Sequence, residues 1–166
     1  MRAFESDGGG VVSALFEPVE ALLLTQLASQ VTELIDESRT HGATADLAIL
    51  RLLPDAYPGD ADASAEFRRF TAAELSERKV RNAATMIADV APAASAAGPV
   101  EVRLDAASAG AWLRSLTDVR LVLATRLGIT EDGAAAEGED EESLMLGDVY
   151  DWLGFVQDSL VNALDD

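Results

Sequence analysis

The stretch that decides the fold runs from Val100 to Gly128 and reads VEVRLDAASAGAWLRSLTDVRLVLATRLG. In residues 100–104, valine and leucine alternate with charged side chains, which is typical of a strand with one buried face. Asp105 can cap the start of a helix, and Gly128 is typical of a helix end. A strand followed by a long amphipathic helix is therefore predicted. The apolar side chains of that helix recur every three or four residues, at Trp112, Leu116, Val119, Leu123 and Leu127.

The same apolar spacing predicts that most of the remaining chain is helical. A capping box and a hydrophobic staple, formed by Phe70, Thr71, Glu74 and Leu75, predict one helix start at Thr71. A shorter helical stretch is expected through Phe67. The other helices are expected from Pro18 to about Arg39 before His41 and Gly42, from an N-cap at Thr44 to Leu53, from Thr71 to about Val90, and from about Leu146 to Ala163.

The first residues of the chain predict a β-hairpin. Residues 2–6 and 11–16 flank three successive glycines, Gly8 to Gly10, which is a composition typical of a turn between two strands. Strand 100–104 is expected to join this hairpin in one sheet. The predicted fold is mainly α, of the α+β class, with five to six helices packed around a core and a small antiparallel sheet. One domain is expected, spanning residues 1–166.

The charge of the chain limits its partners. It has 30 acidic and 12 basic residues, for a net charge of −18, and this field repels phosphate backbones and anionic lipids. Nucleic acid and membrane surfaces are therefore not expected partners. The sequence has no Cys, which excludes disulfides and thiolate chemistry. Glu5 and Asp7 stand where a signal peptide would be basic, and the expected location is the cytoplasm.

Residues 129–142 are predicted to form a flexible acidic loop, because they combine many carboxylates with Gly and Ala and almost no apolar side chains. Acidic loops can bind calcium, but Gly133 and Ala135 occupy positions where an EF-hand loop needs oxygen ligands. No metal and no cofactor is predicted for any part of the chain. The only histidine, His41, lies at a predicted helix end, where a structural role is common.

Four residues of the last helix are candidate partner contacts. Asp148, Asp151, Phe155 and Asp158 follow spacings of three and four, so they share one helix face. These carboxylates could bind a divalent ion, but no His or Glu from a facing helix is apparent. Phe155 is expected to be covered by a neighbouring part of this chain, which is the more common outcome, or else to anchor a basic partner.

Asp118 and Arg120 are the other candidate contacts. Asp118 can pair with Arg114 one turn away on an exposed helix face. Arg120 is expected to form a salt bridge with the acidic last helix, and binding of an anion is the alternative. If Arg120, Asp118 and carboxylates of the last helix met in one pocket, they would form the site of a small-molecule- or metal-binding enzyme.

A small basic cluster is the remaining positive feature, and it comprises Arg68, Arg69, Arg78, Lys79 and Arg81. DNA binding through this cluster would have to overcome the overall negative charge, and no helix-turn-helix pair is evident. A function as a transcription regulator is therefore kept only as a further alternative for this protein.

Several short motifs resemble those of a known family. They are Leu53 to Tyr57 (LPDAY), Trp112 to Arg114 (WLR), Thr117 to Leu121 (TDVRL), Thr125 to Gly128 (TRLG) and Tyr150 to Leu153 (YDWL). Together they resemble an uncharacterised family of actinobacterial proteins, known only as a domain of unknown function, whose genes often neighbour that of the Clp protease adaptor ClpS. The resemblance spans nearly the whole chain. It implies a bacterial cytosolic protein with a link to protein quality control or regulation, and it implies no catalytic residues.

These observations favour a protein-interaction or regulatory module without covalent chemistry. A protein partner is expected. The oligomeric state stays undecided, because the apolar seams of the first and last helices suit packing within the chain and also packing between two copies in a homodimer.

Overall fold

A computed structural model of the chain describes residues 1–41, 46–54, 72–129 and 140–166. It confirms the predicted fold class, because helices dominate and a small three-stranded antiparallel sheet includes an N-terminal hairpin. Over the described residues, the elements are β1 (Glu5–Ser6), β2 (Val12–Phe16), α1 (Pro18–His41), α2 (Leu47–Leu52), α4 (Ala73–Ala94), β3 (Val100–Leu104), α5 (Ala106–Arg126) and α6 (Glu141–Asp165).

The sheet has the order β1-β2-β3, so the strand predicted at residues 100–104 pairs with the second strand of the hairpin. The register places Val12 opposite Leu104 and Phe16 opposite Val100. The hairpin turn needs its glycines, because Gly8 and Gly10 have φ angles of 72° and 87°. The first strand is shorter than predicted and covers only Glu5–Ser6.

One face of the sheet packs on the helices and forms part of the core. The alternation predicted for residues 100–104 is confirmed in β3, since Val102 and Leu104 are buried, and Val12, Ala14 and Phe16 of β2 are buried as well. An aromatic cluster lies at this junction. Its ring centroids are 5.7 to 6.0 Å apart, and its members are Phe4, Phe16 and Trp112.

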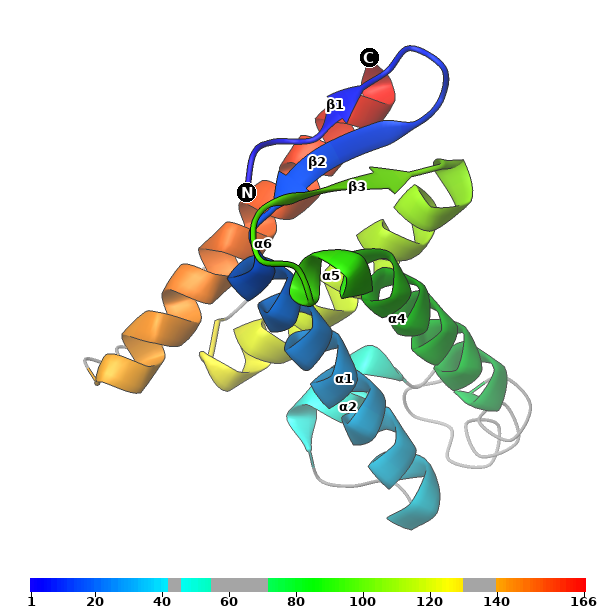
Figure 1. Ribbon diagram of the computed structural model, residues 1–166. Helices are drawn as coiled ribbons and strands as arrows, with labels where there is room; N and C mark the ends of the chain where they lie inside the picture. The colour runs from blue at the N-terminus through cyan, green and yellow to red at the C-terminus, as the bar shows by residue number, and fades with distance from the viewer. Residues whose placement is uncertain (42–45, 55–71, 130–139) are drawn as a thin grey trace.

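Helix α5 lies between several other helices. Helix α1 packs mainly against α4, and α5 contacts α4, α6 and α2. Figure 1 shows the three strands together at one end of the molecule, with α2 beside the last turns of α1 at the opposite end. The predicted boundaries of α5 are confirmed, because Asp105 Oδ1 accepts the N–H of Ser108 at 2.8 Å and Gly128 follows the helix with a φ of 65°.

Two helix starts differ from the prediction. The second helix is capped by Asp46 rather than Thr44, because Asp46 Oδ1 accepts the N–H of Ala48 at 2.8 Å. Helix α4 begins at Ala73, after an Ala72 in helical conformation that makes no side-chain cap. Phe70 and Thr71, on which the predicted capping box and staple depend, lie outside the described residues, as does the helical stretch expected through Phe67.

The end of α4 and the start of α6 also differ. Helix α4 continues past Val90 to Ala94, with Pro92 in its last turns, and buries Ala93. Helix α6 begins at Glu141, so the acidic loop predicted to reach residue 142 is too long at that end. Asp140 caps the helix by accepting the N–H of Ser143 at 2.8 Å, and acidic residues are favourable in a first helical turn. The rest of that loop, residues 130–139, lies outside the described part of the chain.

Candidate functional site

The two charged candidates on helix α5, Asp118 and Arg120, face different neighbouring helices. Asp118 contacts α4, and Arg120 contacts α6. Each residue lines a different pocket. The enzyme site that would combine Asp118, Arg120 and carboxylates of the last helix is therefore not formed.

On the α4 flank, Asp118 forms an ion pair with Lys79. Lys79 Nζ donates to Asp118 Oδ1 at 2.5 Å, and the exposed fractions of the two side chains are only 16% and 10%. Burial raises the pKa of Asp118, although the hydrogen bond and the charge of Lys79 act to lower it. The predicted pairing with Arg114 is wrong, because Arg114 donates to the carbonyl of Gly110 at 2.8 Å. A buried carboxylate gains more from a buried ammonium than from a cation on an exposed helix face.

The pocket beside this ion pair has a volume of about 660 Å³. Its wall carries three cationic side chains, and one of them, Lys79, is neutralised by Asp118. The lining residues are Leu75, Arg78, Lys79, Asn82, Leu113, Arg114, Thr117 and Asp118.

On the α6 flank, Arg120 interacts with uncharged groups. Its guanidinium donates to Gln157 Oε1 at 2.8 Å, and Gln157 Nε2 in turn donates to the hydroxyl of Thr117 at 2.9 Å. The guanidinium carbon lies 4.8 Å from the ring centroid of Tyr150, a cation–π contact. A Cβ at position 154 would lie 3.5 Å from the Arg120 guanidinium, an ordinary van der Waals contact, so this arrangement does not require Gly154. The predicted salt bridge from Arg120 to a carboxylate of the last helix is wrong.

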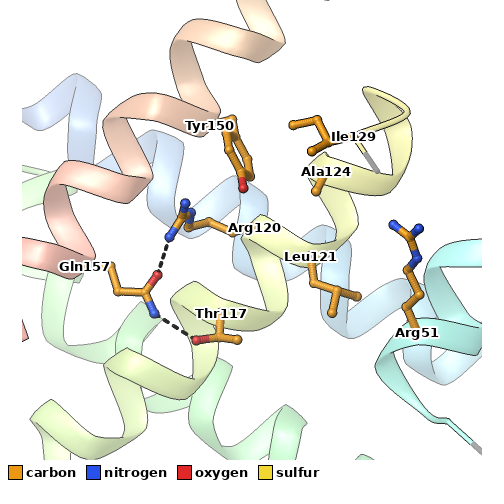
Figure 2. A pocket seen from close by; sticks show the side chains of 8 residues that line it. All are labelled: Arg51, Thr117, Arg120, Leu121, Ala124, Ile129, Tyr150 and Gln157. Carbon is orange, nitrogen blue, oxygen red and sulfur yellow. Dashed lines mark hydrogen bonds between the residues drawn. The ribbon is translucent and has the colours of Figure 1, made fainter. Parts of the chain in front are cut away.

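The pocket on this flank has a volume of about 440 Å³ and lies between α2, α5 and α6. Figure 2 shows Arg120 close to Tyr150 and Gln157, with Arg51 of α2 beyond Leu121. Arg51 donates to the hydroxyl of Thr125 at 3.1 Å. The remaining lining residues are Thr117, Ala124 and Ile129.

The candidate contacts of the last helix form a separate surface. Asp148, Asp151, Phe155 and Asp158 are all exposed, and we call them the outer stripe of α6. The exposed fraction of Phe155 is 46%, so the expected cover from a neighbouring part of the chain is wrong. No residue of the outer stripe lines either pocket.

The basic cluster is partly neutralised within the chain. Lys79 pairs with Asp118, and Arg81 pairs with Glu77 at 3.6 Å. Arg68 and Arg69 lie outside the described residues. Arg78 is exposed and lines the larger pocket, so a continuous basic face is not formed by the members that the structure describes.

Two further properties concern metal ions and membranes. Among the residues with described positions, no three His, Cys, Asp or Glu side chains are grouped so that they could bind a metal ion. Within the same residues, no helix has the length and apolar character needed to span a membrane.

Sequence reasoning missed four residues that shape these pockets: Arg51, Lys79 as a pocket residue, Tyr150 and Gln157. In the sequence, Tyr150 stands out only within a family-like motif, and Lys79 only within the basic cluster. The spacing along α6 carries a usable signal, since Tyr150 and Gln157 lie seven residues apart and so share one helix face. No comparable signal connects Arg51 to α5, because that contact depends on how two helices pack.

Comparison with known proteins gives one family and one distant relative. The profile of the family described as "Domain of unknown function (DUF2017)" matches residues 1–164. A candidate oxidative stress regulator, AosR, of Mycobacterium leprae is 26% identical over 193 aligned positions, which cover 98% of this chain and 87% of the relative. No solved structure shows significant similarity to the chain.

Proposed function

We propose that this chain, which belongs to the DUF2017 family of domains of unknown function, is a regulatory protein that acts by binding a protein partner and catalyses no covalent reaction. The name of the Mycobacterium leprae relative supports a regulatory role in general terms. It does not extend to thiol-based oxidant sensing in this chain, because the sequence contains no Cys.

The chemistry of the two pockets supports a function based on binding. Of the described residues that line them, Asp118 is the one carboxylate, and it is already paired with Lys79. A general base needs a group that can accept a proton at the operating pH, and a nucleophile needs a neighbouring base that activates it. Neither arrangement occurs among the lining residues whose positions the structure describes, which is why we favour a binding protein over an enzyme.

The outer stripe of α6 is the surface that we propose for the partner. One observation carries this proposal: Phe155 is 46% exposed between carboxylates on the adjacent helical turns, Asp151 and Asp158. An exposed aromatic ring can anchor an interface, and the charges around it select the partner. Asp148 extends the acidic surface by one more turn.

The chemistry of this stripe fits a basic protein segment. Lysine or arginine side chains of the partner would face the three aspartates while an apolar residue covers Phe155. A second copy of this chain fits less well, because two chains of net charge −18 repel each other. Direct contact with DNA is disfavoured for the same electrostatic reason.

The gene neighbourhood implied by the family resemblance indicates which proteins to test first as partners. The same resemblance implies a bacterial cytosolic protein. We therefore propose a cytoplasmic protein, with Clp components as the first candidates.

The experiment compares two single substitutions in α6. Phe155→Ser should reduce capture of the partner from a native lysate, and should weaken binding of the purified partner at least about tenfold, because loss of a central aromatic anchor costs about 2 kcal/mol or more. Val161→Ser is the matched control. Val161 is 41% exposed on the same helix but points about a third of a turn away from Phe155.

Two measurements complete the test. Titration calorimetry at two salt concentrations should show weaker binding at high salt, because charged contacts are screened. Replacing all three aspartates of the stripe with asparagine should remove that salt dependence. Equal binding by the Phe155→Ser and Val161→Ser variants, or retention of no partner by the natural sequence at physiological salt, would contradict the proposal.

A further inference from the structure

The pocket between α2, α5 and α6 contains two arginines that have no carboxylate partner among the described residues. Five of the basic side chains in the described part of the chain form ion pairs: Arg39, Lys79, Arg81, Arg103 and Arg126. Arg51 and Arg120 form none with any described residue, and instead donate to the neutral groups of Thr125 and Gln157. Arg2, Arg78 and Arg114 also lack a carboxylate partner among the described residues, but they are exposed, as Arg51 is, whereas Arg120 is half-buried between Gln157 and Tyr150.

Arg120, which lines this pocket, also has a buried donor. Arg120 Nε is buried and has no hydrogen-bond partner in the part of the chain that the structure describes. An unsatisfied buried donor costs free energy, and in native proteins such a group commonly marks a place for a water molecule, an ion or a ligand. A guanidinium has five donors in a planar fork, and the fork matches a carboxylate well.

The other lining residues define what else the ligand must contain. Leu121, Ala124 and Ile129 form an apolar wall, and the ring of Tyr150 lies over the Arg120 guanidinium. The volume of about 440 Å³ is within the range of small-molecule sites in proteins. A ligand that fills this space has an anionic group and an apolar body.

We propose that this pocket binds a small organic monocarboxylate, with the carboxylate at Arg120, the apolar body against Leu121, Ala124 and Ile129, and Arg51 on the far side of Leu121 (Figure 2). A single negative charge is favoured because the net charge of −18 opposes entry of multiply charged phosphates. The Thr117–Gln157–Arg120 hydrogen-bond chain fixes the position of the guanidinium, so little of its freedom is lost when a ligand binds.

This site is independent of the partner surface proposed above. Tyr150 and Gln157 project from α6 into the pocket, whereas the outer stripe of α6 lines neither pocket. Substitutions in the stripe therefore leave the pocket residues in place, and failure of one proposal does not decide the other.

The test uses four probes and two methods. Benzoate and hexanoate supply a carboxylate with an aromatic or an aliphatic body, benzamide is the neutral counterpart of benzoate, and inorganic phosphate is an anion without an apolar body. Titration calorimetry measures affinity. Nitrogen–proton NMR follows the side-chain Nε–H signals of arginine, assigned with the Arg120→Met variant.

We expect saturable, millimolar or tighter binding of at least one of the two carboxylates, with a shift of the Arg120 Nε–H signal. Benzamide and phosphate should each bind at least about tenfold more weakly, because a hydrogen-bonded charge or the apolar contact is lost. Absence of saturable binding by both carboxylates would overturn the proposal. Benzamide or phosphate binding as tightly as the carboxylates would overturn it as well.

Three arginine variants locate the site. Arg120→Met should weaken carboxylate binding about tenfold, because it removes the charged hydrogen-bond donor. Arg51→Met removes a positive charge that lies farther from the carboxylate, and it should weaken binding about fourfold. Arg51 is exposed, so this variant keeps the fold even if Arg120→Met disturbs the α5–α6 contact. Arg78→Met is the matched control, since Arg78 is exposed and lines the other pocket. Its affinity should stay within about twofold of the natural sequence. An equal loss with Arg78→Met would overturn the assignment to this pocket.

Discussion

Asp118 and Arg120 are two residues apart on α5, yet their surroundings differ completely. Asp118 is buried and forms an ion pair with Lys79 of α4. Arg120 has no carboxylate partner among the described residues and contacts the amide of Gln157 and the ring of Tyr150 on α6. The buried carboxylate on the α4 flank is therefore paired with a cation, whereas the α6 flank keeps a buried donor of Arg120 without a partner among the described residues.

The difference follows from the chemistry of the two side chains. A buried carboxylate has a compact charge, and its desolvation is costly unless a cation and hydrogen bonds compensate. A guanidinium spreads its charge over a plane, is more weakly hydrated, and can rest on an aromatic ring. The single lysine of the chain thus pairs with the buried carboxylate, whereas Arg120 contacts neutral groups. Three predictions test this comparison.

The largest effect is expected when the ion pair of the α4 flank loses its cation. Lys79→Met should lower the free energy of unfolding by about 3 kcal/mol, because Asp118 stays buried without a partner. Urea unfolding followed by tryptophan fluorescence measures this change.

Two further variants serve as controls for this substitution. Arg78→Met, one residue earlier on an exposed position, should change stability by no more than about 0.5 kcal/mol. The double variant Lys79→Met, Asp118→Leu should recover most of the loss, because it removes both charges. If Lys79→Met were as mild as Arg78→Met, the ion pair would not be a main stabilising contact of this flank.

The second prediction concerns the pH dependence of the same flank. Burial raises the pKa of Asp118 above its ordinary value of 3.8, so its contribution to stability is present below that value and is lost as the pH rises through the folded-state pKa. Without Lys79, the two influences that lower this pKa are gone, and the pKa rises further. The destabilisation by Lys79→Met should therefore be larger at about pH 7 than at about pH 4.

Other carboxylates do not obscure this result. The backbone N–H of Gly9 lowers the pKa of Asp7, and that of Ser143 lowers the pKa of Asp140, so both stabilise the fold above their ordinary pKa and lose this effect in acid. They act equally in the natural sequence and in the variant, and their effects cancel in the difference. A destabilisation that is the same at both pH values would contradict the assigned role of Asp118.

The sequence predicts the elements better than the contacts between them. The boundaries of α5 depend on neighbouring residues, namely Asp105 as a cap and Gly128 as a stop, and both predictions are confirmed. Strand β3 is predicted correctly from its alternation alone. The predicted start of α2 is misplaced because two capping residues, Thr44 and Asp46, lie close together and aspartate is the stronger N-cap.

The site depends on information that is not local. Lys79 and Asp118 are 39 residues apart, and they meet only because α4 packs against α5 in one rotation. The expected pairings of Asp118 with Arg114 and of Arg120 with the last helix used helical spacing and net charge, which cannot describe burial. The charged face of α6 could be read from its spacing, but the exposure of Phe155 could not, because exposure depends on which elements cover the helix.

The smallest stability effect is expected on the α6 flank. Arg120→Met removes one hydrogen bond to a neutral acceptor and one cation–π contact, and it also removes the unsatisfied Nε donor, so the net loss should be about 1 kcal/mol. The same urea experiment measures this loss beside that of Lys79→Met.

Arg120→Lys is the control, because it keeps the charge and loses the planar fork. Its stability should lie close to that of Arg120→Met, since a lysine cannot reproduce the contacts with Gln157 and Tyr150 together. A loss as large as that of Lys79→Met would show that Arg120 stabilises the α5–α6 contact as strongly as the ion pair stabilises α4–α5. In that case the two flanks would not differ in the way that their partners suggest, and the reason to regard Arg120 as available for a ligand would be lost.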